Sequence, residues 1–110
     1  MLDAFKISVE LIGALRPVLA ELRLRDPDLA NQLTRAAASI GLNIVEGRKR
    51  VGRDQLDLYR VAAGSCEEVR AALMIATAWG HLTAIDLGPT EQLLDREAAT
   101  LYRLVHPRKV

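Results

Sequence analysis

The chain has 110 residues, of which 50% are hydrophobic, 4% are aromatic and 26% are charged, and its formal net charge is +1. This length predicts one domain with a modest core, and the scarcity of aromatic residues favours packed helices over a β-sandwich or barrel. No apolar run reaches the roughly 20 residues of a membrane span. There is neither a signal-peptide pattern nor a second cysteine for a disulfide, so we expect a cytoplasmic protein.

The first helix is predicted over residues 3–24, where apolar residues recur every three or four positions. Pro17 lacks an N–H, and we predict a kink there rather than a break because the apolar spacing continues across it. The main apolar face consists of Phe5, Val9, Ile12, Leu15, Leu19 and Leu22. A second stripe beside it consists of Ile7, Leu11, Ala14 and Val18.

The second helix begins with a clear start signal. Asp26 suits the N-cap, Pro27 suits the first helical position, and Asp28 favours the positive end of the helix dipole. Gly47 is predicted to end the helix, because glycine accepts the left-handed conformation of a C-terminal cap. The apolar face consists of Leu29, Leu33, Ala37, Ile40 and Ile44.

The third helix is predicted over residues 54–79, with Asp54 as its N-cap and Gly80 as its stop. Its apolar residues spread over two stripes, which indicates that more than one neighbouring helix buries it. One stripe contains Leu56, Tyr59, Ala63, Cys66 and Leu73, and the other contains Leu58, Ala62, Ser65, Val69, Ala72 and Ala76.

The fourth helix begins at Pro89, or a little earlier at Asp86, and ends before Pro107. Its apolar line contains Leu94, Ala98, Leu101 and Val105. Short connections make consecutive helices antiparallel neighbours. The sequence therefore predicts an all-α fold, an up-down-up-down antiparallel four-helix bundle, formed by a single domain over residues 1–110.

A stripe of polar residues runs along the second helix, and Gly64 and Ser65 interrupt the otherwise apolar surface of the third. These groups either are solvated or satisfy hydrogen bonds between helices, with the small residues permitting close backbone approach, or they form a surface for another molecule. The candidate network consists of Arg35, Ser39, Asn43, Glu46, Ser65 and Glu68.

Two further apolar residues of the second helix, Leu42 and Val45, cannot point the same way as Ile40 and Ile44. Together with the second stripes of the first and third helices, they give more apolar surface than one four-helix core hides. We therefore predict that Leu42 and Val45 lie in a homo-oligomer interface, and the alternative is a wide core in a monomer.

One short segment, residues 48–53, carries a charge of +4, whereas residues 1–47 sum to −1 and residues 54–110 sum to −2. Its cations either are solvated or bind phosphates, and an oligomer would concentrate them. Cations near the C-terminus extend the patch if the fourth helix ends at the same pole, although no aromatic residue is interleaved for base stacking. The candidate nucleic-acid-binding residues are Arg48, Lys49, Arg50, Arg53, Arg103, Arg108 and Lys109, with His106 beside them.

Catalysis finds little support in the sequence. There is no Gly-rich phosphate loop, nucleophile elbow or zinc-binding helix motif, and neither His81 nor His106 follows a Glu at the spacing of a di-iron bundle. Cys66 lies on an apolar line and is interpreted as a core residue. We expect no catalytic residue, metal or cofactor.

The segment TRAAASIGLNIVEGRKR, residues 34–50, resembles the signature of bacterial four-helix-bundle proteins encoded in intervening sequences of large-subunit ribosomal RNA genes. The pattern Arg-Ala-Ala-x-Ser-Ile occupies residues 35–40, and Asn-Ile-x-Glu-Gly occupies residues 43–47. The Gly-Ser pair at 64–65 before an acidic residue, and Trp79 with Gly80, also match. Between the two patterns the family usually has Pro-Ser, where this chain has Gly41 and Leu42.

This resemblance implies a four-helix bundle that assembles into a ring-like homopentamer. It also implies kinship with accessory proteins of diversity-generating retroelements, which bind nucleic acid and a reverse transcriptase. We therefore expect a non-catalytic oligomer that binds RNA or DNA weakly through its basic pole. The alternative is a structural or adaptor oligomer whose partner is a protein such as a reverse transcriptase.

Overall fold

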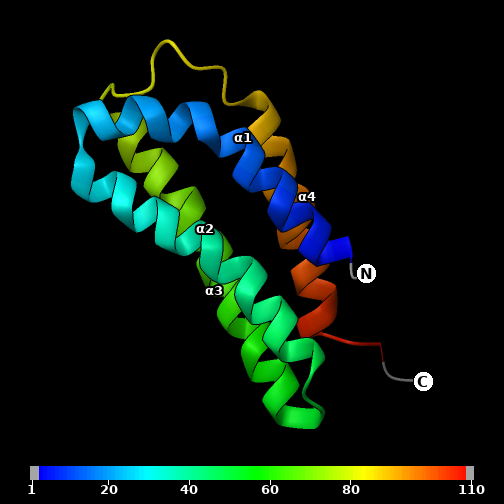
Figure 1. Cartoon of the computed structure of the whole chain (residues 1–110). Helices are drawn as coiled ribbons and strands as arrows, with labels where there is room; N and C mark the ends of the chain where they lie inside the picture. The colour runs from blue at the N-terminus through cyan, green and yellow to red at the C-terminus, as the bar shows by residue number, and fades with distance from the viewer. Residues whose placement is uncertain (1–2, 109–110) are drawn as a thin grey trace.

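The computed structural model describes residues 3–108, and these contain four α-helices and no β-strand (Figure 1). The helices are α1 (Asp3–Arg25), α2 (Pro27–Arg48), α3 (Gly52–Ala78) and α4 (Gly88–Val105). The all-α prediction is thereby confirmed. In the part of the chain that is described, no helix is long and apolar enough to cross a membrane.

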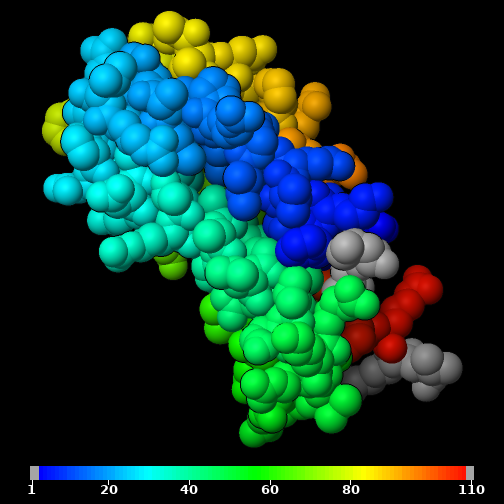
Figure 2. Space-filling view, in the orientation of Figure 1, coloured from blue at the N-terminus to red at the C-terminus, as the bar shows by residue number. Residues whose placement is uncertain are grey.

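The four helices form an elongated molecule of 47 × 23 × 22 Å, in which α2 and α4 each pack against both α1 and α3. Consecutive helices reverse direction in Figure 1. The hairpin of α2 and α3 extends beyond α1 and α4, and its turn forms the projecting end of the molecule in Figure 2. The C-terminal end of α4 lies toward this same end (Figure 1).

The first helix, α1, continues through Pro17 without a break. Its buried face differs from the predicted one, because Val9 and Ile12 are exposed and the second stripe, with Ile7 and Leu11, is buried. Every step of three residues falls about 60° short of a full turn. Every step of four residues overshoots by about 40°, so the predicted line, with three steps of three and two of four, drifts by about 100° around the helix. Only its C-terminal half therefore faces the core.

The start of α2 is as predicted, since the Leu29 N–H donates to Asp26 Oδ1 at 3.1 Å. Its end is not. The helix passes through Gly47 to Arg48, and among the described glycines only Gly52 and Gly80 have positive φ. Gly47 instead serves close packing, because a Cβ on it would lie 2.6 Å from the ring of Tyr59 in α3.

The third helix, α3, begins at Gly52, two residues before the predicted cap Asp54, and Val51 at the N-cap position makes no side-chain cap hydrogen bond. Its end agrees with the prediction. Gly80 has a φ of +77° and its N–H donates to the Thr77 carbonyl at 3.0 Å, while the His81 N–H donates to the Ala76 carbonyl at 3.0 Å. These two bonds form a Schellman cap.

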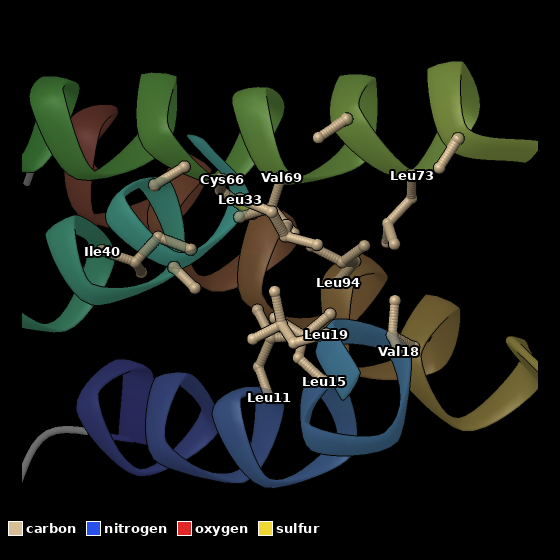
Figure 3. Packing of buried hydrophobic residues seen from close by; sticks show 14 of the residues in the cluster. Leu11, Leu15, Val18, Leu19, Leu33, Ile40, Cys66, Val69, Leu73 and Leu94 are labelled. Carbon is tan, nitrogen blue, oxygen red and sulfur yellow. The ribbon is translucent and has the colours of Figure 1, made fainter. Parts of the chain in front are cut away.

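The core runs along the centre of the bundle, where Leu11, Leu15 and Leu19 of α1 point toward α3 and α4 (Figure 3). Both predicted stripes of α3 contribute buried residues, including Cys66 and Val69. The second stripes of α1 and α3 are thus covered mainly by the chain's own helices, which corrects the expectation that they remain for a partner. The large apolar residues left exposed are Val9, Ile12, Leu24, Leu42, Val51, Val61, Met74, Ile75, Trp79 and Tyr102.

Candidate nucleic-acid interface at the basic end

The turn between α2 and α3, residues 48–53, is called the basic turn below. Its four cations are all exposed, and no acidic group of residues 3–108 lies within 4.0 Å of them. The turn is held by Gln55, whose Nε2 donates to the carbonyls of Gly47 at 3.1 Å and Arg50 at 3.0 Å. Unpaired cations on an ordered, projecting turn are available to an anionic partner. These cations are Arg48, Lys49, Arg50 and Arg53.

The C-terminal end of α4 lies toward the basic turn in Figure 1, and Arg103 and Arg108 at this end are exposed. Arg103 Nη2 donates to Thr100 Oγ1 at 3.3 Å, and His106 Nδ1 donates to the Tyr102 carbonyl at 3.0 Å. The seventh predicted cation, Lys109, lies outside the described residues. The elements that carry the described cations, the basic turn and the end of α4, therefore lie toward the same end of the molecule.

The predicted polar network exists in part, as a cluster that joins α2 to α3. Ser65 Oγ donates to Ser39 Oγ at 2.8 Å, and Asn43 Nδ2 donates to the Ser39 carbonyl at 2.9 Å and to Ser39 Oγ at 3.0 Å. Arg35 and Glu68 are exposed, and neither joins this cluster. Because three polar side chains satisfy one another at the seam, their first role is to hold two helices together.

Glu46, the remaining member of the predicted network, is half-buried. Its Oε2 is buried and has no hydrogen-bond partner among the described residues. Gly64 is exposed and a Cβ on it would meet nothing within 4 Å, so the expected close backbone approach there is wrong. Leu42 is 68% exposed and Val45 is half-buried, and their place in an oligomer interface stays a prediction.

The structure reveals a groove between α3 and α4 that sequence reasoning missed. It has a volume of about 380 Å³, and Tyr102 and His106 line it together with Arg60 and Gly64 of α3. The Tyr102 and His106 rings are stacked, with centroids 4.1 Å apart and an angle of 25°. Aromatic rings therefore do accompany the C-terminal cations, and the spacing of four residues between Tyr102 and His106 was the available signal.

Glu97 is a second feature that the sequence did not disclose. The predicted apolar line of α4 included Ala98, but Ala98 is exposed and Glu97 is 0% exposed. Burial raises the pKa of Glu97 to about 8, and neither carboxyl oxygen has a hydrogen-bond partner among residues 3–108. Burial also raises the pKa of Cys66 to about 11, with a further contribution from Glu97, so this thiol is not an activated nucleophile.

Within residues 3–108, no group of three or more His, Cys, Asp or Glu side chains is arranged to hold a metal ion. The geometry thus defines an all-helical protein with a basic end, a polar cluster that joins two helices, and an aromatic groove. The sequence model of the 23S rRNA-intervening sequence protein family matches residues 2–103. The chain belongs to this family, as its motifs indicate. No curated protein and no solved structure matches it significantly.

Proposed function

We propose that this protein is a non-catalytic helical oligomer that binds RNA or DNA weakly through its basic end. The observation that carries the proposal is the basic turn, where four exposed cations without acidic partners among the described residues project from the bundle. The proposal takes the four helices as an up-down-up-down antiparallel bundle, in which the turn between α2 and α3 and the end of α4 share a pole. Phosphate binding scales with the number of cations engaged, so several subunits would add their turns.

The test is a salt titration of the binding of a fluorescent single-stranded RNA, followed by anisotropy. The double variant Arg48→Glu with Arg50→Glu is expected to lower the affinity at least tenfold and to flatten its salt dependence, because each phosphate contact contributes about 0.7 to the slope for a single strand. Unchanged affinity in this variant would contradict the proposal.

A matched control is available on α1, where Arg16 and Arg23 are exposed and away from the basic turn. The variant Arg16→Glu with Arg23→Glu makes the same change in net charge. It is expected to change the affinity far less, because long-range charge effects on the surface are screened beyond about 10 Å at 0.1 M salt. Equal losses of affinity in the two double variants would show that binding depends on net charge alone and not on the basic turn.

Oligomerisation is the second part of the proposal, and the exposed Leu42 supports it. Light scattering is expected to give a stable mass near five times the chain mass of 12.1 kDa, the number suggested by the family resemblance. Leu42→Glu should lower this mass, since a buried unpaired charge disrupts an interface. The mass of one chain for the unaltered protein would contradict the oligomer.

A structural or adaptor oligomer is the second candidate function, favoured by the exposed apolar residues Leu42, Val61 and Ile75 on α2 and α3. Its partner would be a protein such as a reverse transcriptase, as in the retroelement accessory proteins. It predicts that the isolated protein binds no nucleic acid and that a partner co-purifies from the native cell. Retention of that partner after nuclease treatment would separate this function from the first.

A further inference from the structure

The groove between α3 and α4, called the α3/α4 groove below, has a flat aromatic wall. Tyr102 is 63% exposed, and its ring is stacked on His106 at 4.1 Å. The bond from His106 Nδ1 to the Tyr102 carbonyl, 3.0 Å long, fixes the second ring against the first. Because both rings are already ordered, a planar ligand can stack on them at a low conformational cost.

The floor of the groove consists of small or apolar groups, including Ala63, Cys66 and Ala98. On the α3 side, Gly64 leaves the groove open, since a Cβ at that position would meet nothing within 4 Å. The volume of about 380 Å³ is large enough for one planar ring system. The groove thus combines a flat wall, an apolar floor and an open side.

Cations connect this groove to the basic turn. Arg60 lies seven residues after Arg53 on the same face of α3, about 10 Å further along the helix axis, and it lines the groove. Arg103 follows Tyr102 on α4 but lines the hollow between α1 and α4, so Arg60 is the cation on this path. A chain of phosphates bound at the basic turn therefore has positive charge along its path to the aromatic wall.

Acidic groups are also present in and near the groove. Glu67 lines it, Asp57 contacts Arg60 Nη1 at 3.0 Å, and Asp95 contacts Arg70 Nη2 at 2.9 Å. Both ion pairs are exposed, and exposed pairs contribute little. The Glu67 carboxylate makes the interior of the groove a poor site for phosphate, whereas an uncharged aromatic ring meets no such repulsion.

We propose that the α3/α4 groove binds a nucleobase of a single-stranded nucleic acid, stacked on the Tyr102–His106 pair, while the basic turn binds the neighbouring phosphates. This proposal rests on the proposed function, and it specifies that the nucleic acid bound is single-stranded. Stacking tolerates any base, because every base has a π-face. The groove therefore discriminates single strands from duplexes rather than one sequence from another.

The test measures the affinity for three ligands of equal length by fluorescence anisotropy, namely a single-stranded RNA, an abasic single strand and an RNA duplex. Tyr102→Ala is expected to weaken binding of the single-stranded RNA by about 5- to 150-fold and to leave the abasic strand and the duplex unchanged. Tyr102→Phe retains the ring and should bind all three ligands as the unaltered protein does.

Two further variants test the groove itself and provide a matched control. Gly64→Leu fills the groove from its open side and should reproduce the loss without removing any aromatic group. Trp79→Ala is the matched control, because Trp79 is also exposed and stacked on a histidine, His81, with ring centroids 6.3 Å apart, but it lies where α3 ends, far along the helix from the basic turn. It should leave every affinity unchanged.

The outcomes separate this inference from the proposed function. If the protein binds RNA but Tyr102→Ala and Gly64→Leu bind the single strand as tightly as before, the groove inference fails and the basic turn alone carries binding. Equal losses for the single strand and the abasic strand would also overturn it, because a missing base cannot stack. If the unaltered protein binds none of the three ligands, the proposed function fails, and the groove inference fails with it.

Discussion

The two contact seams of α3, one with α2 and one with α4, differ in how tightly the helices pack at a glycine. At the α2 seam, Gly47 makes room for the ring of Tyr59, which is buried. At the α4 seam, Gly64 has nothing within 4 Å of the position of a Cβ. Two glycines, Gly47 of α2 at one seam and Gly64 of α3 at the other, therefore have opposite consequences. A glycine marks a close helix contact only where atoms of the other helix occupy the space that a Cβ would take.

Polar groups at the two seams differ in degree. On α2, the Ser39–Asn43–Ser65 cluster satisfies its hydrogen bonds and one oxygen of Glu46 has no partner, whereas neither carboxyl oxygen of the fully buried Glu97 on α4 has a partner among the described residues. Two grooves, of about 380 and 390 Å³, lie between α3 and α4 on either side of the ion pair of Arg70 and Asp95. The α2 seam is thus the structural one, and the α4 seam leaves surface for a ligand.

The largest expected effect concerns Glu97 and its dependence on pH. The unfolded carboxyl loses its proton near its ordinary pKa of 4.5, whereas the folded one keeps it up to about 8. Between these values the folded state binds one proton more, so its stability falls with rising pH by about 1.4 kcal/mol per pH unit. The contribution of Glu97 to the free energy of unfolding is therefore fully present below pH 4.5 and is lost by about pH 8.

Glu97→Gln removes this titration, so its stability relative to the unaltered protein should rise by roughly 4 kcal/mol between pH 5 and pH 8. Urea unfolding at both pH values measures the difference. Glu68→Gln, which changes an exposed carboxylate of α3, is the matched control and should show no comparable change. If the difference in free energy of unfolding between Glu97→Gln and the unaltered protein is the same at both pH values, the carboxyl of Glu97 has a hydrogen-bond partner in solution and its pKa is not raised.

The next effect contrasts two glycines inside helices. Gly47→Ala should lower the free energy of unfolding by about 1–3 kcal/mol, because the new Cβ overlaps the buried ring of Tyr59. Gly13→Ala should raise it by about 0.5–1 kcal/mol, since its Cβ meets nothing within 4 Å and alanine is the better helix former. Thermal unfolding checks both, and stabilisation by Gly47→Ala would show that the α2 seam is loosely packed.

The smallest effect concerns the hydrogen bond between Ser39 and Ser65. Ser65→Ala should cost about 0.5–1.5 kcal/mol, because it removes the donor to Ser39 Oγ at the seam. A double-mutant cycle with Ser39→Ala isolates the pair, and the coupling energy should be at least about 0.5 kcal/mol. Additive losses in the double variant would show that the two serines act independently.

Several local features were predicted from the sequence because each depends on residues within about four positions of one another. The Asp26 cap, the passage of α1 through Pro17, the glycine cap at Gly80 and the cations at 48–53 belong to this group. Helix existence and most boundaries follow from the same short-range backbone bonds and apolar spacing.

Other features depend on which residues of different helices meet, and the sequence pattern misassigned them. Gly47 was predicted to cap α2 because the helical pattern stops after it, but its role is set by Tyr59, twelve residues away on another helix. Glu97 was absent from the predicted apolar line of α4, although its spacing from Leu94 and Leu101 fits that line.

The amino-acid sequence by itself determined the four helices, the caps at Asp26 and Gly80 and the position of one basic turn, because these are set by local backbone chemistry and by charge. Only the tertiary structure decided which glycine is packed and which is open, which carboxyl is buried, and that Tyr102 and His106 form the wall of a groove beside Arg60. These features depend on contacts between side chains of separate helices, and the residue spacing within a single helix does not specify such contacts.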